Sequence, residues 1–235
     1  MTRFSFFLAC ALVPAFVLQQ AAAQSASFEV AQNGHTVGTA SFGFTAAPQG
    51  YNASSLVRVA MPGLDYDLSV TGQLSSANEL THVLLSATVN GEAVTAVCKP
   101  DAAQFLLNIS ASGKSTTVRL PAHPATVFLP DFDPGALETL LTLAVEHDNR
   151  DLWAILPKNS GSIEPVQLAT YADQQGTLDG KPIAVHHLIA TIAGGQTDLF
   201  SGPENQLLQA ELPQAGFALV RKGFVLKPSA KPMAR

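Results

Sequence analysis

The segment Asp131–His147 is the only part of this chain with the periodicity of a long helix, and it therefore limits how the rest can fold. Asp133 is placed to cap the helix, and Pro134 follows at the first helical position, where a missing N–H costs nothing. Apolar residues recur at helical spacing along it: Leu137, Leu140, Leu141, Ala144 and Val145. Because Ala136 and Leu143 widen this apolar face, most of the helix must be covered by other elements.

The segments on both sides of this helix have the patterns of strands and tight turns. Asn33-Gly34 and Asn90-Gly91 each separate two extended runs, and such dipeptides are the preferred turns of β-hairpins. Gly38 and Gly43 lie inside an extended run and indicate bends or bulges. These patterns predict about twelve strands. The fold class is therefore α+β, with a strongly curved, mostly antiparallel β-sheet, a half-barrel, wrapped around one central helix at about 133–147.

The first 23 residues have the features of a secretory signal peptide. Arg3 supplies a positive charge, residues 4–18 supply an apolar run, and Ala21-Ala22-Ala23 supplies an A-x-A cleavage site. The alternative is a membrane anchor, but an apolar run of about 15 residues is shorter than the roughly 20 needed to span a bilayer. We therefore expect a secreted or periplasmic protein, cleaved after Ala23, with no integral membrane segment once the leader is removed.

The chain without this leader is mildly acidic. Of its 13 Lys and Arg residues, Arg3 leaves with the leader, and the remaining 12 against 18 Asp and Glu give a net charge of −6. No basic cluster is present, so nucleic-acid binding is not expected. Hydrophobic residues make up 47% of the sequence and charged residues 13%, which is enough apolar side chain for a sizeable core. We expect a single domain at 24–226 and a flexible tail at 227–235.

Residue types that commonly carry chemistry are scattered along the chain. The six histidines, at positions 35, 82, 123, 147, 186 and 187, form neither H-x-H nor H-x-x-x-H, so a zinc site is not indicated. The sequence has no G-x-S-x-G and no phosphate-binding glycine motif. Cys98 is the only cysteine outside the leader, and its strand pattern predicts a buried, inert thiol. We therefore expect no metal, no cofactor and no enzymatic activity; a hydrolase that uses scattered His and acidic residues is the less favoured alternative.

The adjacent residues His186 and His187 lie in an extended run, 181–193, that is apolar on both faces. Such a run predicts a central strand covered on both sides. Neighbouring residues of a strand point to opposite faces, so the two imidazoles cannot bind one metal ion together. The preferred interpretation is that one histidine is hydrogen-bonded in the core and the other lies at an edge; the sequence does not identify a further role for either.

A curved sheet around one helix leaves an apolar cavity if the two do not fill the space between them. A bound ligand would then contact four residues of the helix and five residues of facing strands. These candidate ligand-binding residues are Leu137, Leu140, Leu141, Val145, Phe105, Leu107, Trp153, Val185 and His187. The alternative is that the same side chains pack together and leave no cavity.

The order of the predicted elements is also informative. A leader is followed by a meander of long strands, one mid-chain helix and further strands. The segments that carry the likeness lie at the opening and the close of the part that follows the leader: Phe28-Glu29-Val30, Asn33-Gly34, Val37-Gly38, Leu207-Leu208, Leu212-Pro213 and Gly216-Phe217-Ala218-Leu219-Val220-Arg221. In this layout the chain resembles the half-barrel of periplasmic lipoprotein carriers, the LolA and LolB type, and secreted bacterial domains of the same shape.

Carriers of that type shield acyl chains in the concave face of the sheet. The resemblance therefore implies a hydrophobic small molecule or lipid as the ligand, and it implies no catalytic residue. The alternative function is a structural or protein-interaction domain of the cell envelope with a filled core, whose protein partner the sequence does not identify.

Overall fold

The computed structural model describes residues 24–158 and 160–228. The predicted leader, residues 1–23, and tail residues 229–235 lie outside this part of the chain. The described residues contain seventeen strands and one helix, rather than about twelve strands as the sequence patterns predicted. The prediction of a sheet-rich fold with one helix is confirmed, and the strand count was wrong.

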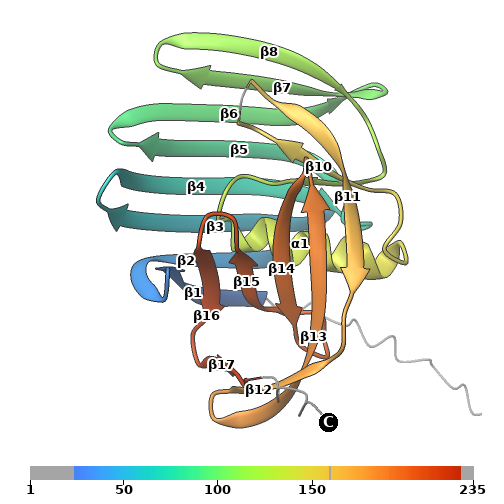
Figure 1. Ribbon diagram of the computed structural model, residues 1–235. Coiled ribbons are helices and arrows are strands. Elements are labelled where there is room, and N and C mark those ends of the chain that lie inside the picture. Colours follow the sequence, from blue (N-terminus) through green and yellow to red (C-terminus); the bar gives the residue numbers. More distant parts are fainter. Residues whose placement is uncertain (1–23, 159, 229–235) are drawn as a thin grey trace, which may run out of the picture.

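The first eight strands form an antiparallel meander in which each strand pairs with the next (Figure 1). Both predicted Asn-Gly turns are present, with positive φ angles at Asn33, Gly34, Asn90 and Gly91, as type I′ turns require. The strands are β1 (Gln24–Gln32), β2 (His35–Ala47), β3 (Gly50–Met61), β4 (Leu64–Ser75), β5 (Leu80–Val89), β6 (Glu92–Asp101), β7 (Gln104–Ala111) and β8 (Lys114–Pro121).

The helix α1 (Pro134–Glu146) connects β9 (Ala125–Phe128) to β10 (Leu152–Leu156). β9 and β10 pair in parallel, because a crossover through a helix brings the chain back in the same direction. The helix begins as predicted: the Asp133 carboxylate accepts hydrogen bonds from the backbone N–H groups of Gly135, at 2.8 Å, and Ala136, at 3.2 Å. The predicted helix is therefore confirmed, and it forms part of a βαβ unit within the mostly antiparallel sheet.

The remaining strands return to the start of the meander. β10 pairs with β11, β11 with β13, and the pairing then follows chain order to β16, which pairs with β1. β12 pairs with β13 and with β17. Among the described strands, β8 pairs in register with β7 and β9 with β10, but β8 and β9 do not pair in register with each other, so the sheet is open. These strands are β11 (Ser162–Thr170), β12 (Gln174–Leu178), β13 (Lys181–Ile192), β14 (Gly195–Ser201), β15 (Leu207–Leu212), β16 (Phe217–Arg221) and β17 (Phe224–Leu226).

Two glycines, Gly176 and Gly223, account for part of the difference between the predicted and the observed number of strands. Gly176 looks like a turn residue, but it lies in β12, where a Cβ atom would be 2.8 Å from the Phe224 ring and 2.9 Å from the Val225 carbonyl oxygen. A glycine is needed there because β17 approaches closely. Gly223, with φ +82°, lies in the turn between β16 and β17 and so divides the extended segment 217–226 into two strands.

The main core surrounds α1, which lies between the meander and the later strands (Figure 1). Strands β2, β3, β9, β10 and β15 contact the helix. A smaller cluster forms on the other face of the later strands, around Val185, Phe200, Leu208 and Phe224. β13 has strand neighbours on both edges and apolar contacts on both faces, which confirms that the run 181–193 is a central strand.

The Cys98 thiol is fully buried, as predicted, and burial raises its pKa to about 12. It is therefore protonated at neutral pH, and a protonated thiol is a poor nucleophile. Within the described residues, no helix is long and apolar enough to cross a membrane.

Candidate functional site

A cleft of about 650 Å³ opens at the N-terminal end of α1. We call it the α1 cleft. The connection 129–133 and the first turn of the helix form one side of it, and the ends of β10, β11, β13 and β14 and the connection from β15 to β16 form the other. Its volume lies within the range of roughly 300–1,000 Å³ that is usual for small-molecule sites.

Much of the lining of the α1 cleft is apolar. Leu137 projects from the helix, Leu156 from the end of β10 and Ile192 from the end of β13. Leu212 and Leu219 come from β15 and β16. Strand ends that are distant in sequence therefore place branched aliphatic side chains around one space.

The charged groups of the α1 cleft include an exposed ion pair. Lys158 Nζ lies 2.8 Å from Asp131 Oδ1, and both side chains are about half exposed. An exposed pair of this kind contributes little to stability, on the order of 0–1 kcal/mol. Glu164, Gln196 and Gln214 add further polar groups. The cleft thus combines aliphatic side chains with charged and polar ones.

Phe132 lines the same cleft in an unusual backbone conformation, with φ +61°. Positive φ is rare for a bulky residue and is retained only where surrounding contacts hold it. Its ring packs edge-on against Tyr66, with 6.0 Å between ring centroids, and at a tilt of 58° against Phe217, with 4.7 Å between centroids. The Tyr66 hydroxyl donates a hydrogen bond to the Asp131 carbonyl oxygen at 3.2 Å. Burial, and then the charges of Asp131 and Asp133, raise the pKa of Tyr66, so that this donor keeps its proton.

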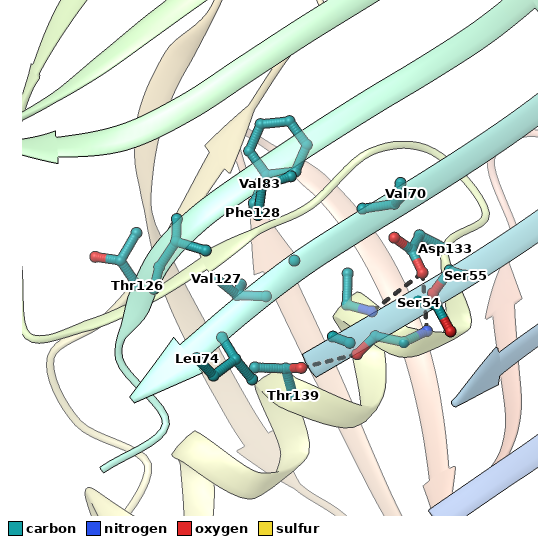
Figure 2. A pocket seen from close by; sticks show the side chains of 15 residues that line it. Ser54, Ser55, Val70, Leu74, Val83, Thr126, Val127, Phe128, Asp133 and Thr139 are labelled. Atoms are coloured by element: carbon teal, nitrogen blue, oxygen red, sulfur yellow. Dashed lines mark hydrogen bonds between the residues drawn. The ribbon is translucent and has the colours of Figure 1, made fainter. Parts of the chain in front are cut away.

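A second, smaller cavity lies between the first turn of α1 and strands β3 to β5 (Figure 2). Asp133, Ser55, Val70, Val83 and Phe128 contribute to its wall. Its volume is about 40 Å³. A cavity needs about 10–15 Å³ to hold one water molecule, so this one has room for very few atoms. It is too small for a lipid or a drug-sized ligand.

Asp133 itself is almost fully buried, at 2% exposure. Burial raises the pKa of this carboxyl, and hydrogen bonds from Ser55, Ala136 and Gly135 oppose the rise. Since the folded-state pKa lies above the unfolded value of about 3.9, the stabilisation linked to the protonated form is present below the unfolded pKa. It is lost as the pH rises through the folded-state pKa.

We therefore expect Asp133→Asn to gain stability relative to the native protein as the pH is raised from about 4 towards neutrality, because asparagine keeps the helix cap and does not titrate. Urea unfolding of both proteins across this pH range measures the difference. Asp133→Ser, a second uncharged cap, should show the same trend. A difference between native protein and variant that stays constant with pH would contradict this prediction.

His187 lies on the other face of β13 from Ile192, within reach of the smaller core cluster. Its Nε2 is 2.8 Å from Asp198 Oδ1, and its Nδ1 is 3.5 Å from the Gln174 side-chain amide. The ring stacks on Phe200, with 4.6 Å between centroids. Both ring nitrogens therefore face protein groups, and the arrangement serves to hold β12, β13 and β14 together.

His186 makes a separate and exposed contact, with its Nδ1 3.0 Å from Asp173 Oδ1. The two neighbouring histidines thus have different acidic partners. In the described part of the chain, no group of three or more His, Cys, Asp or Glu side chains is arranged to hold a metal ion.

Of the nine candidate ligand-binding residues, only Leu137 lines the α1 cleft. Leu140, Leu141, Phe105 and Leu107 are buried in the main core. The other four lie elsewhere: Val145 is 56% exposed near the end of the helix, Trp153 stacks on His123 at 3.7 Å, Val185 belongs to the smaller cluster, and His187 pairs with Asp198.

The sequence patterns missed Phe132, Ile192, Leu212 and Leu219 as lining residues. Ile192, Leu212 and Leu219 lie at or near strand ends, next to Ala193-Gly194 and Pro213–Gly216, so a turn signal accompanied each of them. No local pattern shows that these ends converge on the start of the helix. Comparison of the chain with family models, with curated proteins and with solved structures found no match. The proposed function therefore rests on the geometry of the cleft.

Proposed function

We propose that this protein is exported, loses its leader after Ala23, and holds an apolar or lipid-like ligand in the α1 cleft. The observation that carries this proposal is a cleft of about 650 Å³ that combines aliphatic side chains with a charged pair, Lys158 and Asp131. An amphiphile fits that distribution, because its chain can cover the aliphatic side chains while its head group stays hydrated. In this proposal the sheet curves around α1 as a half-barrel, with the cleft at one end of the helix.

Burial of an acyl chain supplies the binding energy. Each CH₂ group that leaves water for an apolar surface contributes about 0.8 kcal/mol. A chain of several such groups therefore offsets the cost of immobilising the ligand. The resemblance to the LolA and LolB carriers supports the same ligand class, because those proteins shield acyl chains in the concave face of their sheet.

The second candidate function is a structural or protein-interaction domain of the cell envelope. One observation favours it: the middle of α1 is tightly packed, with Leu140 and Leu143 each only 1% exposed. The interior beside those residues is filled. A ligand of the first proposal would therefore bind only in the α1 cleft, at the N-terminal end of the helix.

Thr197→Trp separates the two functions. Thr197 is a half-buried β14 residue that lines the α1 cleft, and an indole there would fill part of the space for a ligand. We expect it to weaken binding of a fluorescent long-chain fatty acid by at least about tenfold, which corresponds to about 1.4 kcal/mol.

The matched control is Thr95→Trp, the same change at an exposed position of β6. It should bind the fatty acid as the native protein does. Native protein that does not bind the probe, or equal binding by the two tryptophan variants, would contradict the assignment of the ligand to the α1 cleft.

A further inference from the structure

Glu138 is a carboxylate on α1 that is almost fully buried, at 4% exposure. Its Oε2 accepts a hydrogen bond from the backbone N–H of Leu207 at 2.6 Å, and its Oε1 accepts one from the side-chain amide of Gln24. Burial raises the pKa of Glu138, and the Leu207 N–H, the charge of Arg221 and the Gln24 amide oppose the rise. The group therefore joins the helix to β15 and to the first residue of β1.

The two groups that donate directly to Glu138 are both uncharged. Within residues 24–158 and 160–228, Glu138 takes part in no ion pair. Arg221 acts from farther away, and its Nη1 lies 3.5 Å from the Leu207 carbonyl oxygen. A buried carboxylate without a directly bound cation is costly, so a further positive charge at this position would stabilise the fold.

The contact with Gln24 is informative because of the position of Gln24 in the sequence. Cleavage after Ala23 would make Gln24 the first residue of the chain, and its backbone nitrogen would change from an uncharged amide into an ammonium group. A hollow of about 260 Å³ lies beside this residue, lined by Gln24, Glu138, Phe44, Tyr51 and Thr142 among others. There is thus open space that both the carboxylate and Gln24 border.

We infer that Glu138 is the docking site for the processed N-terminus: the α-ammonium group of Gln24 enters this hollow and forms an ion pair with the carboxylate. The inference rests on the processing step of the proposed function and is independent of the ligand. It gives the buried carboxylate a directly bound cation, which no other described residue supplies. It also makes the mature fold different from that of the precursor at one defined point.

Docking has a chemical consequence for Gln24. An amino-terminal glutamine can cyclise: its α-amine attacks the side-chain Cδ, a new N–C bond forms and the Cδ–Nε2 bond breaks. One proton of the amine passes to Nε2, which leaves as ammonia. The attacking amine must carry a free electron pair. An ammonium group held by Glu138 has none, and the side-chain amide is held by the same carboxylate. Gln24 therefore stays uncyclised in the folded mature protein.

The test uses the full precursor exported by a bacterial host, in three versions. The first is the native sequence, the second has a threonine inserted between Ala23 and Gln24, and the third is Glu138→Gln. The inserted residue displaces the ammonium group by about 3.8 Å along the chain. The measured quantities are the intact mass, the rate at which an amine-specific reagent labels the terminus at neutral pH, and the rate of ammonia loss from Gln24.

We expect terminal labelling in the native protein to be at least tenfold slower than in the other two versions, and ammonia loss to be slower than in Glu138→Gln. Equal labelling rates in all three would overturn the docking inference. If Glu138→Gln does not fold, the labelling rate of the native protein is compared with that of the threonine insertion, and equal rates in these two versions overturn the docking inference. An intact mass that excludes Gln24 as the first residue would instead overturn the processing step, and with it the inference.

Discussion

Leu140→Ala is expected to destabilise the protein by about 2–5 kcal/mol, the range measured for large-to-small changes at buried aliphatic positions. Leu140 lies at the middle of α1 and is 1% exposed within the main core. Strands from both the meander and the later set contact the helix, so the cavity left by the change cannot collapse easily. Urea unfolding followed by circular dichroism gives the free energy of unfolding.

Val145→Ala is the control on the same helix. Val145 is 56% exposed, and we expect this change to cost no more than about 0.5 kcal/mol. If the two substitutions were equally costly, the helix would not be enclosed as described, and its exposed side would have to be covered by another molecule.

Gly38→Ala is expected to destabilise the protein by about 2 kcal/mol or more, because an added methyl group at this position overpacks a close approach between strands. A Cβ atom at Gly38 would overlap the Arg58 carbonyl oxygen and lie 2.9 Å from Val59 Cα. Both neighbours are backbone atoms of β3, so relief of the overlap requires the β2–β3 ladder to move. The pairing of β1 with β2 is irregular at this point: it passes from Val30 opposite Gly38 to Ala31 opposite Thr36 and leaves Val37 as an extra residue of β2.

Gly43 offers a matched comparison in the same strand. A Cβ atom there would lie 3.5 Å from the Ser54 hydroxyl oxygen, which is ordinary contact. Gly43→Ala should therefore leave the thermal unfolding midpoint unchanged or raise it, since alanine restricts the unfolded chain. A midpoint that falls equally in both variants would show that β2 needs glycine for another reason.

The features that the sequence predicted correctly are those coded by neighbouring residues. Asp133 and Pro134 define the helix start through a local cap, and Asn33-Gly34 and Asn90-Gly91 define turns through local backbone preference. Gly38 was predicted to mark an irregularity, and it lies next to the extra residue of a bulge in β2. Each of these signals acts over a few residues, so the sequence alone is enough to detect it.

The features that were missed depend on contacts between distant segments. The parallel pairing of β9 with β10 follows from the direction in which α1 crosses the sheet, and Gly176 makes sense only once Phe224 is placed against it. The candidate ligand-binding residues were chosen by helical and strand periodicity. That criterion identifies the buried face of a helix or strand. Most of the chosen residues, such as Leu107, are part of the hydrophobic core. Periodicity does not distinguish a filled interior from one with a cavity.

The location of the α1 cleft depends on one strained residue and on the convergence of strand ends. Phe132 has a positive φ angle that no sequence pattern indicates for a phenylalanine, and it forms one side of the cleft. Leu212 and Leu219 reach the same space from β15 and β16. Leu137 was chosen as a candidate ligand-binding residue by helical periodicity, and its position at the open end of the helix was visible only in three dimensions.

The most direct test of the central proposal is a native mass spectrum of the protein exported by a bacterial host, recorded before and after solvent extraction. A protein that holds a lipid-like ligand in the α1 cleft should carry added mass that extraction removes, and Thr197→Trp should carry much less of it. The mass of the adduct would then identify the ligand class. A native protein with only the mass of its polypeptide, before and after extraction, would contradict the proposal and favour an interaction domain with a filled core.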